Sequence, residues 1–195
     1  MTLENMTTAD WSYLADKAHA NAVAKGFWDE ERSIRHYLML VVCELAEAIE
    51  ADREGRTASI PEGIEDFPDK AFAPSFESHI KDTLEDELAD AVIRLLDIWA
   101  EAFPDEEVYI SSGYMVGALT LTEVASMAAE SLLDKEIYNL SEVNLLCGNY
   151  LIGCMQYAID ILYSYAKNGG IDLDRHILLK MRYNATRPRL HGKKY

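Results

Sequence analysis

Paired cysteines and long hydrophobic runs are scarce in this sequence of 195 residues. Its 3 cysteines form no CxxC pair, which argues against a disulfide framework, and we expect buried, reduced thiols at Cys43, Cys147 and Cys154. No apolar stretch approaches the roughly 20 residues that a bilayer span needs. The first residues carry no basic region followed by an apolar one. We therefore expect a cytoplasmic protein with no membrane partner.

Positive charge is also scarce, except at the end of the chain. The formal net charge is -16, and 7 of the 18 Lys and Arg residues lie in Arg175–Tyr195, which contains no Asp or Glu. Non-specific affinity for nucleic acid depends on neutralising phosphates. An acidic body therefore argues against nucleic acid as a partner, while the basic end remains available for smaller anions.

Glycine and proline, at 10 and 5 residues, are too few to suggest a loop-rich or disordered chain. Apolar residues recur at helical spacing and alternating β-branched runs are absent, so the sequence predicts an all-α fold. The length suits one domain over residues 1–195. The expected helices span Thr8–Ala24, Asp29–Arg53, Phe76–Ala102, Ser141–Lys167 and Leu173–Tyr183, with another opening in a Thr120–Glu123 capping box. Three prolines predict a loop over Arg56–Ser75.

Two carboxylates interrupt an apolar helix. Glu44 and Glu47 lie in "YLMLVVCELAEAI", residues 37–49, which is otherwise apolar. At 100° per residue the expected core stripe of this helix and the stripe carrying the two glutamates point in different directions. The core stripe is Leu38, Val42, Leu45 and Ile49, and the other is Leu40, Glu44, Glu47 and Ala51. Adjacent carboxylates repel one another unless they are protonated or bridged by a cation.

A second acidic pair, Glu87 and Asp90, lies in "EDELADAVIRLLD" on the next long helix. Either pair alone would more often be a solvated helix face, but two such pairs on facing apolar helices favour a metal site. With no cysteine or histidine nearby, Mg²⁺ is preferred over Zn²⁺, and Mn²⁺ is the alternative. A di-iron bundle would require Glu-x-x-His on two helices, and the sequence has no such motif.

At these residues the sequence resembles the MazG-type nucleoside triphosphate pyrophosphohydrolases. The matching pieces are "KGFWDEE", "LVVCELAEAIEADREG", "LEDELADAVIRLLDI" and "LLKMRYNATRPRLHGKKY". The second and third carry the ExxE and ExxD signatures of that family. The resemblance implies a helical bundle of the all-α NTP pyrophosphatase type with additional helices. It leaves an insertion at about 54–76 and an unplaced region at about 104–140.

The implied reaction is metal-dependent hydrolysis of an NTP or dNTP to the monophosphate and pyrophosphate. The resemblance implies four metal ligands, Glu44, Glu47, Glu87 and Asp90. Glu47 is the candidate general base, with Glu44 nearly as good. A water beside the metal would attack the α-phosphorus.

Four further residues are candidates for contact with the nucleotide. Lys180, Asn184 and Arg187 are spaced to share a helix face that could hold phosphate oxygens. Trp28 could stack on a base, although packing is an equal alternative. Arg94 is placed for an i, i+4 ion pair with Asp90.

Two questions stay open at this point. The rival to an enzyme is a non-enzymatic helical module that binds a metal or a partner. The apolar faces of the helix Asp29–Arg53 also need cover on more than one side, which predicts a homodimer or a higher homo-oligomer. The competing explanation is that residues 104–140 fold back over this helix.

Overall fold

The structure is a computed structural model that describes residues 8–138, 145–192 and 194. These residues form an all-α protein without strands, with seven helices longer than one turn and three short helical pieces. The elements are α1 (Thr8–Ala24), α2 (Ile34–Glu54), η1 (Ile64–Asp66), α3 (Asp69–His79), α4 (Leu84–Ala102), α5 (Leu121–Leu132), α6 (Lys135–Tyr138), α7 (Leu145–Asn168), α8 (Leu173–Thr186) and η2 (Arg189–Gly192). Within this part of the chain, none of the helices has the length and apolar character of a membrane span.

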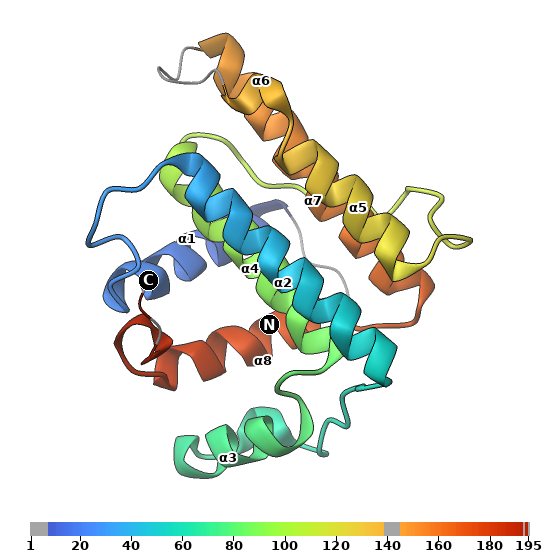
Figure 1. Cartoon of the computed structure of the whole chain (residues 1–195). Coiled ribbons are helices and arrows are strands. Elements are labelled where there is room, and N and C mark those ends of the chain that lie inside the picture. Colours follow the sequence, from blue (N-terminus) through green and yellow to red (C-terminus); the bar gives the residue numbers. More distant parts are fainter. Residues whose placement is uncertain (1–7, 139–144, 193, 195) are drawn as a thin grey trace.

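Helix α4 is the centre of the fold, and α1, α2, α7 and α8 pack around it (Figure 1). Twelve of its residues are buried, on nearly every side of the helix, which is the pattern of a helix enclosed by others. Helix α2 runs antiparallel to α4, so side chains on the facing sides of the two helices meet (Figure 1). This pairing brings the two acidic motifs together.

Two of the four residues in the predicted core stripe of α2 are replaced by the residue just before them. Val41 and Ala48 are fully buried beside Leu38 and Leu45, whereas Val42 and Ile49 are only partly buried. The predicted start at Asp29 was also wrong, because α2 begins at Ile34. The Ser33 side chain caps it by accepting a hydrogen bond from the backbone N–H of His36.

The predicted loop over Arg56–Ser75 is present only before Asp69, where the short η1 interrupts it, and the predicted helix start at Phe76 was wrong. Helix α3 occupies Asp69–His79, includes Pro74, and ends before a separate helix α4 that is capped by Thr83. Burial compensates for the backbone hydrogen bond that Pro74 cannot make. The Phe76 ring stacks on Tyr183 of α8, with the centroids 4.5 Å apart, and Phe72 packs in the same cluster.

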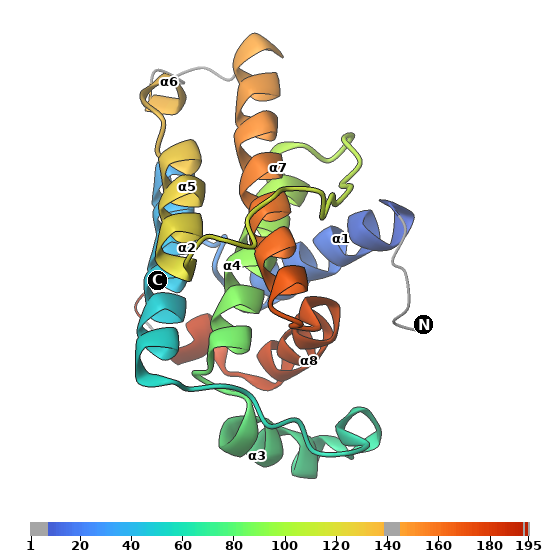
Figure 2. The ribbon, with the colours of Figure 1, turned by 90° about the vertical axis from the view of Figure 1, so that its right-hand side faces the viewer.

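Residues 104–140, which the sequence could not place, contribute α5 and α6. The Thr120–Glu123 capping box predicted at the start of α5 is confirmed. Helix α5 pairs with α7 and also packs against α2 (Figure 2). The explanation that this region folds back over α2 within one chain is therefore realised in the structure.

The helix predicted over Ser141–Lys167 corresponds to α7, and its first residues lie outside the described part. The cysteine prediction is corrected at one position: Cys154 is buried, but Cys43 is exposed on the outer side of α2. The side chain of Cys147 lies outside the described residues.

Candidate functional site

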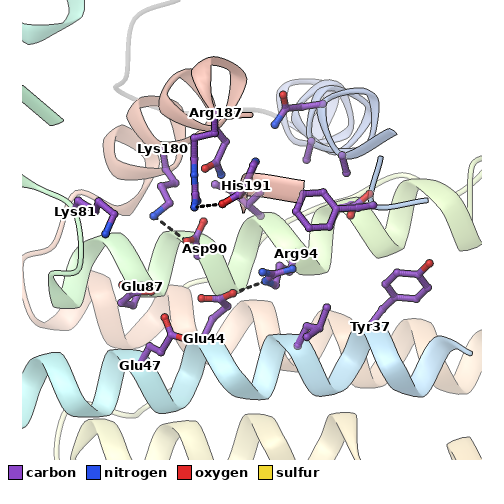
Figure 3. Close-up of a pocket in the computed structure, with 18 of the residues that line it drawn as sticks. Tyr37, Glu44, Glu47, Lys81, Glu87, Asp90, Arg94, Lys180, Arg187 and His191 are labelled. Carbon is purple, nitrogen blue, oxygen red and sulfur yellow. Dashed lines mark hydrogen bonds and ion pairs between the residues drawn. The ribbon is translucent and has the colours of Figure 1, made fainter. Parts of the chain in front are cut away.

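A cavity of about 280 Å³ lies between α1, α2, α4, α8 and η2 (Figure 3). Seven of the eight site residues predicted from the sequence line it. Six of them lie on α2, α4 and α8, and the seventh is the residue that caps the end of α8. These are Glu44, Glu47, Glu87, Asp90, Lys180, Asn184 and Arg187. The eighth, Trp28, is not one of the described residues that line the cavity.

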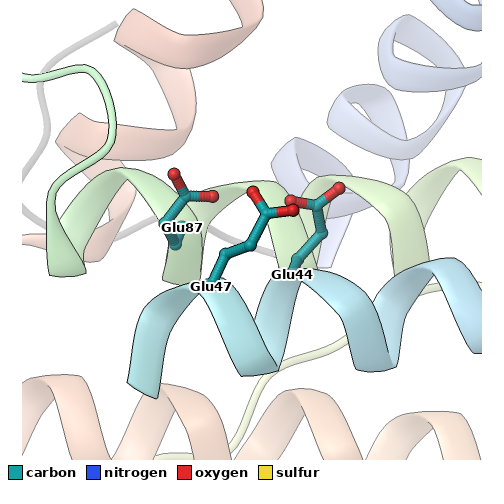
Figure 4. Close-up of side chains that lie close together, drawn as sticks. All are labelled: Glu44, Glu47 and Glu87. Carbon is teal, nitrogen blue, oxygen red and sulfur yellow. The ribbon is translucent and has the colours of Figure 1, made fainter. Parts of the chain in front are cut away.

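Three glutamates meet at one end of the cavity. Glu44 and Glu47 extend from α2 toward Glu87 on α4, and one oxygen of each lies within 4.8 Å of the others (Figure 4). Glu44 and Glu87 are only 3% and 4% exposed, whereas Glu47 is exposed. A cluster of carboxylate oxygens without sulfur or imidazole suits a hard divalent cation such as Mg²⁺ or Mn²⁺.

Burial disfavours the charged form of two of these glutamates. It raises the pKa of Glu87 to about 8, and the nearby carboxylates of Asp90, Asp86 and Glu44 act in the same direction against the lowering effect of Lys180. Burial likewise raises the pKa of Glu44, although the Arg94 guanidinium opposes the shift. A bound cation would favour both ionised forms, so the donor set fits a divalent ion.

Asp90, the fourth predicted ligand, does not belong to this three-glutamate cluster. Lys180 Nζ lies 2.8 Å from Asp90 Oδ2 and 2.7 Å from Asp86 Oδ2. Burial alone would raise the pKa of Asp90, but the Lys180 ammonium holds it below its usual range. Asp86, which has no exposed surface, has its pKa raised by burial to about 6 despite the same lysine. Ligation of a metal by Asp90 stays a prediction.

Arg94 pairs across helices instead of within α4. Its Nε donates to Glu44 Oε1 at 2.5 Å, so the predicted i, i+4 ion pair with Asp90 is corrected to a pair with a metal-ligand candidate on α2. The Arg94 side chain remains about a quarter exposed. It therefore lies on the cavity wall next to the glutamate cluster.

The C-terminal residues supply polar groups to the opposite wall. Asn184 is buried, and its Oδ1 has no hydrogen-bond partner within the described protein. Arg187 ends α8 and donates from Nη2 to the backbone oxygen of His191 at 3.3 Å. The predicted shared face is present as far as Asn184, and Arg187 reaches the cavity from the C-cap position (Figure 3).

The end of the cavity away from the glutamates is aromatic. Phe27 and Tyr37 line it, and Trp28 stacks behind Tyr37 with the ring centroids 4.2 Å apart. Trp28 Nε1 also donates to Asp97 Oδ1 at 2.9 Å. The structure thus gives Trp28 the packing role, and direct contact of its ring with a base stays a prediction.

Sequence reasoning missed several lining residues. Lys81 precedes α4 at the glutamate end of the cavity (Figure 3). His191 reaches the cavity from η2, and its ring packs against that of Phe27 with the ring centroids 5.0 Å apart. Burial lowers the pKa of His191 to about 3, so its imidazole is neutral at pH 7. Asp97 had a detectable signal, because it lies seven residues after Asp90 on the same helix face. His191 had none, since its place depends on a turn in which it and Leu190 adopt positive φ.

None of the family models, curated proteins or solved structures compared with this chain matches it.

Proposed function

We propose that the chain is a MazG-type pyrophosphohydrolase that converts a nucleoside triphosphate to the monophosphate and pyrophosphate with Mg²⁺ or Mn²⁺. One observation carries this proposal: a single cavity joins a cluster of three glutamates, several cationic side chains and an aromatic end. The all-α bundle of the NTP pyrophosphatase type, implied by the sequence motifs, is part of the same proposal.

The layout of the cavity supports a nucleotide as the ligand. Lys81, Lys180 and Arg187 lie near the glutamates and can contact phosphate oxygens, Arg187 through two nitrogens at once (Figure 3). The aromatic end can hold a flat ring. Glu87 and Asp97 mark the two ends on α4, ten residues apart, which corresponds to about 15 Å at 1.5 Å per residue. That span is comparable to the length of an extended nucleotide.

The chemistry needs a positioned water and neutralised phosphate charge. When bound, the divalent ion would neutralise phosphate oxygens and lower the pKa of a water. Glu47 would accept a proton from a water beside the α-phosphorus; the oxygen of this water bonds to that phosphorus while the bond from the phosphorus to the bridging oxygen of pyrophosphate breaks. Lys180 and Arg187 stabilise the charge on the departing pyrophosphate. Glu47 is favoured over Glu44 as the base because Glu44 already accepts from Arg94.

The test is release of pyrophosphate from a panel of the common NTPs and dNTPs, with and without Mg²⁺ or Mn²⁺. Activity that requires the metal supports an enzyme. The non-enzymatic module predicts a different result: Mg²⁺ raises Tm by binding the folded state, but no nucleotide yields pyrophosphate. Absence of both effects would refute the metal site itself.

The homodimer or higher homo-oligomer also remains a proposal. Helix α5 covers one side of α2, but Met39 and Cys43 stay exposed on another side. Light scattering decides between an oligomer and a particle of the 22.0 kDa monomer mass.

A further inference from the structure

Asp97 is a carboxylate at the aromatic end of the cavity. It lies about 15 Å along α4 from Glu87, at 1.5 Å per residue, and its side chain keeps 16% of its surface exposed. The cavity that Asp97 lines is also formed by Ala22, Phe27 and Tyr37, together with polar groups such as Arg94. An acceptor in such surroundings strongly prefers a ligand that offers a donor, since an unpaired polar group out of water is costly.

Two neighbours fix which oxygen of Asp97 is available. Trp28 Nε1 donates to Oδ1 at 2.9 Å, and His19 Nδ1 lies 2.8 Å from the same oxygen. The indole N–H is only ever a donor, so the group facing Trp28 has to be an acceptor. Among the described residues no hydrogen bond or ion pair to Oδ2 is found, which leaves this oxygen for a ligand that enters the cavity.

We propose that Asp97 selects nucleobases that carry an exocyclic amino group over bases that carry a carbonyl oxygen at the same place. Cytosine and adenine present an N–H donor where uracil and hypoxanthine present an acceptor, and guanine adds an amino group that hypoxanthine lacks. A carbonyl facing Oδ2 would leave two acceptors opposed. The inference rests on the proposed function only in taking the ligand to be a nucleotide.

The alternative contact for Oδ2 is a ribose hydroxyl. The sugar lies between the base and the phosphates, so a ribose contact would place the phosphates closer to Asp97 than the glutamate cluster is. A separation of about 15 Å along α4 favours the far edge of the base instead. Comparing each NTP with its dNTP distinguishes the two contacts.

The experiment measures kcat/KM for the pairs CTP and UTP, ATP and ITP, and GTP and ITP, each ribonucleotide also as its 2′-deoxy form. Hydrogen bonds to charged groups predict that the wild type prefers the amino member by about 10-fold to 100-fold. In Asp97→Asn the amide oxygen must face Trp28, which places the NH₂ group at the Oδ2 position. The acceptor becomes a donor, so the ratios should fall to about one or reverse.

Glu101→Gln is the matched control. Glu101 lies one turn further on and contacts the other nitrogen of His19 at 3.2 Å, so its substitution removes a nearby charge without changing Oδ2. The control should keep the wild-type ratios. Ratios unchanged in Asp97→Asn, or a change only in discrimination between NTP and dNTP, would overturn the inference.

A binding measurement separates this inference from the proposed function. Calorimetric titration of CMP and UMP into the intact protein needs no turnover. Tighter binding of CMP that is lost in Asp97→Asn would support the base contact even if no triphosphate were hydrolysed. Equal binding of the two monophosphates by the wild type, in a protein that does release pyrophosphate, would reject the base contact and leave the proposed function standing.

Discussion

Arg94 donates a hydrogen bond to Glu44 at 2.5 Å and so joins the two helices that carry the acidic motifs. The guanidinium is the counter-charge of a glutamate that is almost fully buried. Without a metal, the Arg94 guanidinium is therefore the group that opposes the rise in the pKa of Glu44 caused by burial. With a metal, the ion and the guanidinium would share the same carboxylate, and their effects on it would be in competition.

This competition gives the first prediction. Arg94→Gln should lower the stability of the metal-free protein by about 1–3 kcal/mol, because a charged hydrogen bond is lost and Glu44 is left without its partner. The same change should increase the rise in Tm that Mg²⁺ produces, since the glutamate cluster becomes more negative. Thermal denaturation in chelator and in Mg²⁺ measures both effects.

Arg53→Gln is the control for Arg94. Arg53 forms an exposed pair with Glu50 on α2 at 2.8 Å, and exposed pairs contribute little to stability. It should change neither the metal-free Tm nor the response to Mg²⁺. A smaller response to Mg²⁺ in Arg94→Gln than in the wild type would show that Arg94 supports the cation site instead of competing with it.

The second prediction concerns Lys180, whose ammonium is buried between Asp86 and Asp90. Removing one partner of a buried ion pair leaves uncompensated charge, so Lys180→Met should cost about 3–5 kcal/mol. Adding Asp86→Asn should restore part of this loss, because one of the two stranded carboxylates disappears. Urea unfolding of the wild type, the two single variants and the double variant gives the interaction free energy between Lys180 and Asp86. Strictly additive effects would argue against the pair.

The third prediction concerns catalysis. Glu47→Gln should reduce pyrophosphate release at least about 100-fold, the lower range for loss of a general base. It should leave stability nearly unchanged, because Glu47 is exposed. Glu50→Gln, one turn along α2, removes a carboxylate that is also exposed and should keep wild-type activity. Full activity in Glu47→Gln would exclude Glu47 as the base.

The acidic motifs could be predicted from the sequence because their signal is local. Glu44, Glu47 and Glu87 interrupt apolar helix faces, and helical periodicity places them on the facing sides of α2 and α4. The helix break at Asp82 had a weaker signal, since Phe76–Ala102 reads as one periodic pattern. Asp82 adopts a φ of 61°, and the burial of Ile80 and Leu84 in the core favours the break over a continuous helix.

The partners of the charged residues could not be predicted in the same way. Lys180 lies 94 residues after Asp86 in the sequence, and Arg94 lies 50 residues after Glu44. Periodicity fixes the direction of a side chain about its own helix but not which residue of another helix lies opposite. Spacing and the family resemblance therefore assign Asp90 to the glutamate cluster, whereas packing of α8 against α4 gives it Lys180 as its partner.

The last prediction is the pH dependence that Glu87 imposes. Burial raises the pKa of Glu87 from 4.5 to about 8, so the folded state binds this proton more tightly than the unfolded state does. The stabilisation that comes from this tighter proton binding is fully present below about pH 4.5 and is lost as the pH rises through about 8. In chelator, the free energy of unfolding of the wild type relative to Glu87→Gln should therefore fall between pH 5 and pH 8. We expect a fall of at least about 1 kcal/mol, or about 2–4 °C in Tm for a chain of this length.

Saturating Mg²⁺ should reduce the fall, because the cation favours the ionised carboxylate. Glu50→Gln, measured in parallel, should follow the wild type, and a constant difference between wild type and Glu87→Gln across this range would contradict the buried, proton-binding state of Glu87.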